Sequence, residues 1–493
     1  MATCEAERCV CDAIPVSCHV ELSLIDVFVG TSTQYRGTVT LGYQVEHTAN
    51  CLFFHVDDKR VILGDMRVVQ GKRVSKPRGL HSCAAGSGSC GNLTLAWSQP
   101  GASINVSSFL PPLPIGDLKL VELAHPASYC VLELVVEFRG SLTDDHTGIY
   151  VAASRPAGAI SATPSIRSAA SAGQRLIATQ FEVDHARRCF PCVDFVFIRQ
   201  AVSFSLTVPH GAYCRANGGA AEPSASARDT AAAPAAVRLD LPPSARRIPM
   251  YVAGFVASTI PLVCNSRSLV CPRIAVSTHS DDEELDEMAL VLAVVSCHDS
   301  PFNHKLALDA MHDAVRELRG FLHCNIDVPE LALVAIPELL LGGMENDGII
   351  FIREALGTPA GVRKPAAAAT HDLVRLIVHE VAHHWIGNRI GFGFAWKEGI
   401  TLVIERYFGN LLLGLPLEQG STKGSCENDE RAALVQVEHG SELSGETYHR
   451  VEAAMEGLVR RLGWSVFQRG LRRMCQLPTG TFVPDEELMQ CFK

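Results

Sequence analysis

The sequence has no apolar run long enough to cross a membrane and no excess of basic residues. Its apolar stretches at residues 288–297 and 331–341 fall short of the roughly 18–20 residues that span a bilayer. Lysine and arginine number 43 against 53 acidic residues, which gives a formal net charge of −10. Because phosphate binding needs clustered basic side chains, nucleic acid is not an expected partner.

The N-terminus also lacks a recognisable secretory leader. Residues 1–18 carry Glu5, Glu7 and Asp12, where a leader would have an apolar core. The 18 cysteines are scattered along the chain and do not form the dense pattern of small disulfide-bonded domains. We therefore expect reduced thiols and a cytoplasmic location; the sequence indicates no particular oligomeric state.

The composition is that of a folded chain, with 47% apolar and 19% charged residues. A length of 493 residues exceeds one ordinary core, so two or three domains are expected. The first half is rich in Val, Thr, Leu and aromatic residues between turn formers. This pattern predicts strands at residues 20–29, 37–46, 203–208 and 237–241.

The pattern changes after about residue 258. Apolar residues then recur at helical spacing in residues 281–295, 305–322, 371–386, 447–462 and 466–474. We therefore expect an α+β chain with a β-rich domain over residues 1–258 and a mostly helical domain over residues 259–493. Two Ala-, Ser-, Gly- and Pro-rich stretches, near residues 152–173 and 216–236, are interpreted as surface insertions in the first domain.

The most informative motif is HEVAH at residues 379–383. Four residues apart on a helix, His379 and His383 share one face and can bind the same ion. A catalytic zinc site has three protein ligands and leaves one position for water, whose pKa zinc lowers from roughly 15.7 to 7. Glu380 stands beside the first histidine, in place to accept a proton from that water. Such a motif also arises by chance, but the apolar residues around this one favour a buried zinc helix.

The third ligand must come from another segment. Residues 397–399 read KEG and precede an apolar run at residues 400–404. A carboxylate at the start of that second helix can face the two histidines, so Glu398 is the predicted ligand. Glu405 competes for this role and is interpreted as an acid that holds a ligand from behind or forms a salt bridge.

Three motifs in this order resemble the aminopeptidase N type of zinc aminopeptidases, a thermolysin-like (gluzincin) group. Residues 342–346 read GGMEN where the family has GxMEN, residues 379–388 read HEVAHHWIGN where it has HExxHxWxGN, and KEG stands where it has NEG. Upstream, TQFE at residues 179–182 and ARRCFPCVD at residues 186–194 resemble the family's TQFEPTDARRAFPCFDEP. The resemblance covers most of residues 12–493.

The resemblance implies a zinc-dependent aminopeptidase that hydrolyses the N-terminal peptide bond of peptides with a free N-terminus. It implies one zinc ion per chain, held by His379, His383 and Glu398, with Glu380 as general base. It also implies an antiparallel, saddle-like β domain followed by a thermolysin-like catalytic domain. Tyr448, by its position ahead of Gly463, corresponds to the family tyrosine that stabilises the oxyanion, although the family's YxKG reads YHRV here.

The same resemblance places the substrate's α-amine against Glu345. Charge-assisted hydrogen bonds from an ammonium to a carboxylate are strong, so this assignment is physically reasonable. The implied substrate-binding residues are Gln180, Glu182, Gly342, Gly343, Met344, Glu345 and Asn346. Arg187 and Arg188, within the ARRCFPCVD segment, are interpreted as structural residues that pair with nearby acids.

Four features depart from the family pattern. The stretch between His383 and Glu398 is shorter than in the family, as is the stretch between Glu398 and Tyr448. Val183 and His185 replace a proline and an aspartate. The sequence ends where the family's C-terminal helical domain would begin, so a shortened member is expected. These departures leave two alternatives: a relative that binds peptides as a scaffold without hydrolysis, and an epoxide-hydrolysing relative with the same metal site.

Overall fold

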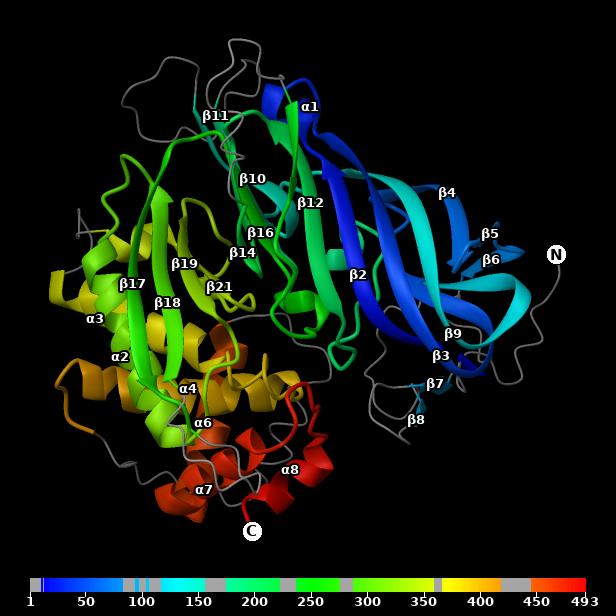
Figure 1. Cartoon of the computed structure of the whole chain (residues 1–493). Coiled ribbons are helices and arrows are strands. Elements are labelled where there is room, and N and C mark those ends of the chain that lie inside the picture. Colours follow the sequence, from blue (N-terminus) through cyan, green and yellow to red (C-terminus); the bar gives the residue numbers. More distant parts are fainter. Residues whose placement is uncertain are drawn as a thin grey trace. The chain divides into compact units, whose positions relative to one another are not determined.

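A computed structural model describes residues 10–11, 13–82, 94–96, 103–105, 117–155, 174–221, 236–274, 287–358, 366–417 and 445–493. The chain divides into two compact units, Met1–Pro261 and Leu262–Lys493 (Figure 1). The sequence pattern put the division near residue 258. None of the helices in the described ranges combines the length and apolar character needed to cross a membrane.

The described part of the first unit consists mainly of strands. They are β1 (Val10–Cys11), β2 (Ala13–Ser23), β3 (Gln34–His55), β4 (Val61–Gln70), β5 (Arg73–Ser75), β6 (Gly79–Ser82), β7 (Thr94–Ala96), β8 (Ser103–Asn105), β9 (Leu118–Ser141), β10 (Gly148–Arg155), β11 (Gln174–Gln180), β12 (Ala201–Pro209), β13 (Tyr213–Ala216), β14 (Gly219–Ala220), β15 (Ala236–Asp240) and β16 (Phe255–Ser258). The helical segments are α1 (Ile25–Val29) and the 3₁₀ turns η3 (Ala186–Arg188) and η5 (Met250–Val252).

The largest sheet of this unit has the order β15-β12-β2-β3-β9-β4-β5, with β6 also paired to β9. Its strands are antiparallel except for the parallel pair β2 and β12. A second, antiparallel sheet has the order β10-β11-β16-β13-β14, and β1, β7 and β8 form a third. Long β3 shows why the sheet forms, because Val39, Leu41 and Tyr43 alternate toward the core as a half-buried strand requires.

Most strand predictions for this unit are confirmed, since residues 37–46 lie in β3, residues 203–208 in β12 and residues 237–240 in β15. The prediction for residues 20–29 is wrong in its second half, where the chain forms α1. Gly30 ends this single turn with φ of 80°, a left-handed conformation that glycine adopts at little cost. An apolar run this short does not distinguish a helical turn from a strand.

The two stretches interpreted as insertions begin inside the sheet. Ala152 and Ala153 are buried in β10, and Ala216 is buried in β13. The remainder of each stretch, residues 156–173 and 222–235, lies outside the described residues.

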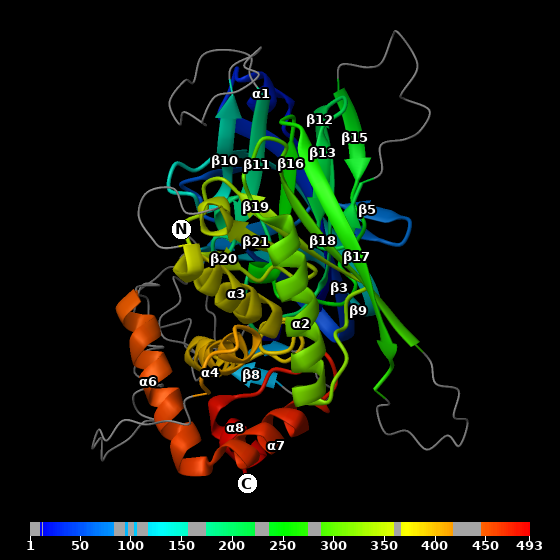
Figure 2. The same cartoon turned by 90° about the vertical axis from the view of Figure 1, so that its left-hand side faces the viewer.

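The second unit contains a mixed sheet as well as helices. Its elements are β17 (Leu262–Pro272), β18 (Glu287–Cys297), α2 (His304–Leu322), β19 (Glu330–Ile336), β20 (Gly343–Met344), β21 (Ile349–Arg353), η6 (Glu354–Gly357), α3 (Ala366–Ala382), α4 (Phe394–Leu412), α6 (Gly445–Leu462), α7 (Trp464–Cys475) and α8 (Asp485–Cys491). The sheet order is β17-β18-β19-β21-β20, with β18, β19 and β21 parallel and both edge strands antiparallel. Figure 2 shows helices α2 and α3 beside this sheet.

Helices form most of the regular structure in the described part of this unit, as expected, but the sequence pattern did not predict its five-stranded sheet. The helix predicted at residues 281–295 is wrong in its described part, which is strand β18. This strand has neighbours on both sides and is buried without interruption from Leu292 to Cys297. A strand buried on both faces is a continuous apolar run, and its periodicity resembles that of a buried helix. The helices predicted at residues 305–322, 447–462 and 466–474 are confirmed by α2, α6 and α7.

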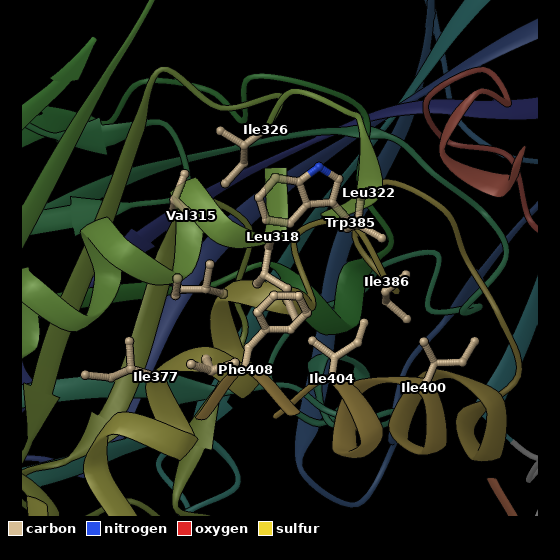
Figure 3. Packing of buried hydrophobic residues seen from close by; sticks show 14 of the residues in the cluster. Val315, Leu318, Leu322, Ile326, Ile377, Trp385, Ile386, Ile400, Ile404 and Phe408 are labelled. Carbon is tan, nitrogen blue, oxygen red and sulfur yellow. The ribbon is translucent and has the colours of Figure 1, made fainter. Parts of the chain in front are cut away.

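An apolar core fixes the helices that carry the functional motifs. Figure 3 shows side chains from α2, from the end of α3 and from α4 meeting in one cluster. The labelled members are Val315, Leu318, Leu322, Ile326, Ile377, Trp385, Ile386, Ile400, Ile404 and Phe408. Because a close-packed interior tolerates little displacement, this cluster holds α3 and α4 in a fixed relation to each other.

Candidate metal centre

Two histidines and one glutamate converge in the second unit. His379 lies in the last turn of α3, and His383 follows that helix with its N–H still donating to the His379 carbonyl at 3.2 Å. Glu398 lies in the second turn of α4. The three side chains offer ligand atoms within 4.8 Å of one another, and each is at most 8% exposed. Within the described ranges, no other group of three or more His, Cys, Asp or Glu residues meets this condition.

The spacing of these atoms fits a zinc ion. The Nε2 atoms of His379 and His383 are 3.0 Å apart. Glu398 Oε2 lies 3.4 Å from His379 Nε2, and Glu398 Oε1 lies 3.7 Å from His383 Nε2. Ligand atoms about 2.0–2.2 Å from a tetrahedral zinc ion would be about 3.3–3.6 Å apart. Two imidazole nitrogens and one carboxylate are also a ligand set that catalytic zinc sites use.

The charges in this cluster support one another. Burial alone would raise the pKa of Glu398, but Lys397 and His383 hold that pKa well below its usual range. Burial alone would lower the pKa of His379, but hydrogen bonds to Glu398 and Glu405 raise it well above its usual value.

Glu405 and Glu398 act on opposite sides of the His379 ring. Glu405 Oε2 lies 2.9 Å from Nδ1 of His379, whereas Glu398 faces Nε2. The Glu405 carboxylate thus accepts the Nδ1 proton and leaves Nε2 available for an ion. His383 is oriented in a similar way, because its Nδ1 donates to the carbonyl of Ile386 at 3.0 Å.

We expect Glu405→Gln to weaken zinc binding by about 10–100-fold, because the charged acceptor behind His379 is lost while the imidazole remains. Titrating the zinc-loaded protein with a chelator of known affinity measures the change. Glu317→Gln, on the outer part of α2, is the matched control and should leave zinc affinity unaltered. Equal zinc affinity in Glu405→Gln and the unmodified chain would contradict the role given to Glu405.

Glu380 lies against the backbone of edge strand β20. A Cβ built on Gly343 would overlap the Glu380 carboxylate. The carboxylate is buried, and the glycine leaves the space that it occupies. Gly343 therefore has a steric function in the GGMEN motif: it lets this strand approach helix α3 closely.

The variant Gly343→Ala is expected to lower kcat/KM by about 10–100-fold, because displacing a reacting group by about 1 Å costs a factor of this order. Zinc content should not change. Gly320→Ala on α2 is the control, since its new Cβ would meet nothing within 4 Å. Steady-state kinetics on both variants measure the difference, and equal activities would contradict a steric role for Gly343.

His384 and Asn388, which were not predicted as site residues, connect the GGMEN segment to the end of α3 and the turn that follows it. Asn388 Nδ2 donates to the Glu345 carbonyl at 2.9 Å. The Gly348 N–H donates to His384 Nε2 at 3.1 Å, and His384 Nδ1 donates to the Glu380 carbonyl at 3.1 Å. Both residues stand in the HEVAHHWIGN motif, which is the signal that could have identified them.

Glu345 is paired with a buried lysine. Lys397 Nζ lies 2.6 Å from Glu345 Oε1 and 3.1 Å from Glu398 Oε1. Burial alone would raise the pKa of Glu345, but Lys397 keeps that pKa below its usual value. Met344 and Asn346, the neighbours of Glu345 in the motif, are at most 1% exposed.

Tyr448 lies on α6, next to the beginning of α4. Its ring is half-buried and stands edge-on to Phe394, with 6.0 Å between the ring centroids. Helix α6 approaches α4 closely at Gly399, where a Cβ would come within 3.0 Å of Met455 and 3.1 Å of Val451. The glycine of the KEG motif thus permits the packing that brings the Tyr448 helix beside the Glu398 helix.

Gln180 and Glu182 belong to the first unit. Gln180 ends β11 and Glu182 follows two residues later, and both side chains are at least 95% buried. The expected structural role of Arg187 is confirmed, because its Nε lies 3.0 Å from Asp194 Oδ2 in a fully buried pair. The Nη2 atom of Arg188 lies 4.0 Å from Oδ1 of Asp184.

Comparison with known proteins agrees with this arrangement. Residues 306–477 match the peptidase family M1 domain, and residues 116–223 match the peptidase M1 N-terminal domain. Aminopeptidase N of Lactococcus lactis subsp. lactis is 24% identical over 372 residues, covering 69% of this chain and 38% of the relative. The puromycin-sensitive aminopeptidase of Caenorhabditis elegans is 24% identical over 400 residues, covering 76% and 37%.

Aminopeptidase M1-C of Oryza sativa subsp. japonica is 22% identical over 356 residues, covering 69% of this chain and 36% of the relative. The chain thus spans little more than a third of the length of these relatives. The two matched M1 domains nevertheless cover more than half of its residues, in the order that the motifs follow. By these matches and its relatives, the chain belongs to peptidase family M1.

Proposed function

We propose that this chain is a zinc-dependent aminopeptidase that hydrolyses the first peptide bond of peptides with a free N-terminus. The observation that carries the proposal is the convergence of His379, His383 and Glu398 beside Glu380. Membership of family M1 supports it, as do relatives named as aminopeptidases.

His379, His383 and Glu398 would hold one zinc ion per chain. A zinc ion held there supplies Lewis acidity toward a water molecule and toward a peptide carbonyl. The residues behind the ligands keep them in place: Glu405 holds His379 through Nδ1, and the Ile386 carbonyl holds His383. Both Nε2 atoms thereby stay directed at the ion.

Glu380 is proposed as the general base. Its carboxylate would accept a proton from the attacking water and pass it to the nitrogen of the leaving amine, so that no net proton is gained or lost. Glu380 is 3% exposed, so its carboxylate is shielded from bulk water. Tyr448 is proposed to donate a hydrogen bond to the carbonyl oxygen as negative charge develops there.

Glu345 is proposed to bind the α-ammonium of the substrate. Strand β20 is an edge strand of the described sheet, where it pairs with β21, and an extended peptide is proposed to pair along its other side. A peptide lying along Gly342 and Gly343 would bring its amine toward Glu345, the next residue but one. Gln180 and Glu182 remain the proposed second amine-binding group on the strength of the TQFE motif.

The cytoplasmic location expected from the sequence remains a proposal. The cysteines in the described ranges are free thiols, which is compatible with a reducing compartment.

The test combines metal analysis with a panel of fluorogenic aminoacyl amides. We expect about one zinc per chain and release of the fluorophore from amides with a free amine, with both lost in His379→Ala. N-acetylated amides should not react. Stoichiometric zinc without hydrolysis of any amide would favour the peptide-binding alternative, and turnover of a lipid epoxide alone would favour the epoxide-hydrolysing one. Absence of bound zinc from the purified chain would contradict the proposal.

A further inference from the structure

Lys397 is a buried cation at the centre of the candidate site. Its side chain is 4% exposed, and its Nζ lies 2.6 Å from Glu345 and 3.1 Å from Glu398. The same Nζ stands 6.0 Å from the centre of the Phe394 ring, which covers the lysine from the side of the preceding helical turn. Both carboxylates are themselves at most 4% exposed.

This arrangement is unusual for a lysine. Lysine side chains are almost never fully buried unless they are paired, because removing an ammonium from water is costly. Here one ammonium pairs with two buried carboxylates that have different proposed tasks. Glu345 is the proposed amine-binding residue, and Glu398 is a proposed metal ligand. Lys397 therefore contacts both the proposed amine-binding carboxylate and one of the proposed metal ligands.

Glu345 is held at both ends. Asn388 donates to its backbone carbonyl at 2.9 Å, and Lys397 donates to Oε1 of its carboxylate at 2.6 Å. A glutamate side chain rotates about several bonds, and an unrestrained one must be ordered when a ligand binds. With Oε1 engaged by Lys397, Oε2 remains for a further donor.

The position of Lys397 in the sequence adds a geometric consequence. Lys397 and Glu398 are consecutive residues in the second turn of α4, so their Cα atoms are a fixed distance apart. The Thr401 hydroxyl donates to the Lys397 carbonyl at 2.8 Å within the same helix. Through Lys397, the position of the Glu345 carboxylate is therefore tied to the helical turn that carries Glu398, the third proposed ligand.

We propose that Lys397 is a positioning residue that sets the distance between the amine-binding carboxylate and the metal centre. The proposal rests on the function proposed above, in which Glu345 binds the substrate α-ammonium. An amine held at a fixed distance from the metal places only the first peptide bond at the reacting centre. Lys397 thus contributes to the selection of the N-terminal bond without touching the substrate.

If Lys397 instead competed with the substrate amine for Glu345, substituting it would change amine affinity in the opposite direction. If Lys397 merely occupied Glu345 as a competing ammonium, its removal would free the carboxylate and tighten the binding of an amine. A positioning residue has the reverse effect, because its removal leaves Glu345 disordered and buried without a counter-ion. The direction of the change in amine affinity therefore separates the two roles.

The test compares Lys397→Met, which keeps the length of the side chain but removes its charge, with Lys397→Arg, which restores a cation. Lys305→Met is the matched control, since Lys305 is 88% exposed on α2. Calorimetry in the zinc-loaded Glu380→Gln background measures binding of leucinamide and of N-acetyl-leucinamide. Kinetics in the otherwise unmodified chain measure kcat and KM for leucine p-nitroanilide.

We expect Lys397→Met to weaken leucinamide binding at least tenfold and to raise KM by a similar factor, with kcat changed less than threefold. Binding of N-acetyl-leucinamide and the zinc content should not change. Lys397→Arg should recover part of the loss, and Lys305→Met should show none. Unchanged or tighter leucinamide binding in Lys397→Met would overturn the positioning role.

A double-mutant cycle covers the case in which the single variant does not fold. Glu345→Gln together with Lys397→Met removes both charges and leaves no unpaired ion between these two residues. If Lys397 acts through Glu345, the lysine substitution has no further effect on leucinamide binding in the Glu345→Gln background. A further tenfold loss there would also overturn the proposal.

These outcomes also separate this proposal from the proposed function. A chain that hydrolyses no amide, yet binds leucinamide in a manner dependent on Lys397, would refute the peptidase activity and uphold the positioning role. A chain with full aminopeptidase turnover whose leucinamide binding does not change in Lys397→Met would uphold the peptidase activity and refute the positioning role.

Discussion

Glu380→Gln lowers kcat for aminoacyl amides by about 10²–10⁴-fold in the outcome we expect, the usual contribution of a general base. Glutamine has nearly the same shape, so it should fit the space beside Gly343 that the carboxylate now fills. It does not accept the proton of the attacking water, and the reaction loses that step. The three residues facing the metal position are untouched, so zinc should remain at one per chain.

The measurement pairs steady-state kinetics with metal analysis on the same preparation. Glu446→Gln, at a side chain that is 74% exposed on α6, is the control and should keep full activity. Full turnover in Glu380→Gln would remove Glu380 as the base. Loss of zinc in this variant would instead make Glu380 part of the ligand set, and the assignment of Glu398 would then need revision.

The spacing of His379 and His383 was enough to predict that they converge, because a helical turn between them puts both on one face, and that turn is present. Spacing alone does not separate Glu398 from Glu405, since the two acids are seven residues apart and lie on one face of α4. Glu398 was predicted as the ligand because it begins the second helix. The structure is consistent with that choice, since Glu398 lies at Nε2 of His379 and Glu405 at Nδ1.

Two local predictions failed for a common physical reason. Strand β18 is apolar on both faces, and helix α1 is a single turn, so neither carries a periodicity that distinguishes helix from strand. In both cases tertiary contacts decide the structure. For β18 these contacts are its two neighbouring strands: β17 pairs with it along its whole length, and β19 pairs with residues 291–295.

The role of Lys397 is a further feature that sequence alone did not reveal. A lysine next to a glutamate on a helix is usually a solvated pair, and the KEG motif gives no sign of burial. The structure places Lys397 between two glutamates. Glu345 is 52 positions away from Lys397 in the sequence, and Glu398 is its neighbour. Such a contact depends on how β20 and α4 pack, which no short motif encodes.

Glu398→Gln should release the metal and, in the metal-free chain, lower the pKa of His379. The hydrogen bond from His379 to Glu398 is the largest of the influences that raise this pKa, so removing the carboxylate moves it downward. Zinc affinity should fall by at least about 100-fold, more than the roughly 10–100-fold expected for an outer partner such as Glu405. Chelator competition measures the affinity, and NMR titration of the His379 ring measures the pKa.

The two readouts of Glu398→Gln test different statements. The fall in pKa depends only on the contact between His379 and Glu398, whereas the loss of zinc depends on Glu398 being a ligand. Glu405→Gln is the comparison, because it also removes a partner of His379 but from the side away from the metal. A variant that loses the pKa shift but keeps its zinc would show that Glu398 contacts His379 without binding the ion. The third ligand, and with it the proposed peptidase mechanism, would then have to be sought elsewhere in the chain.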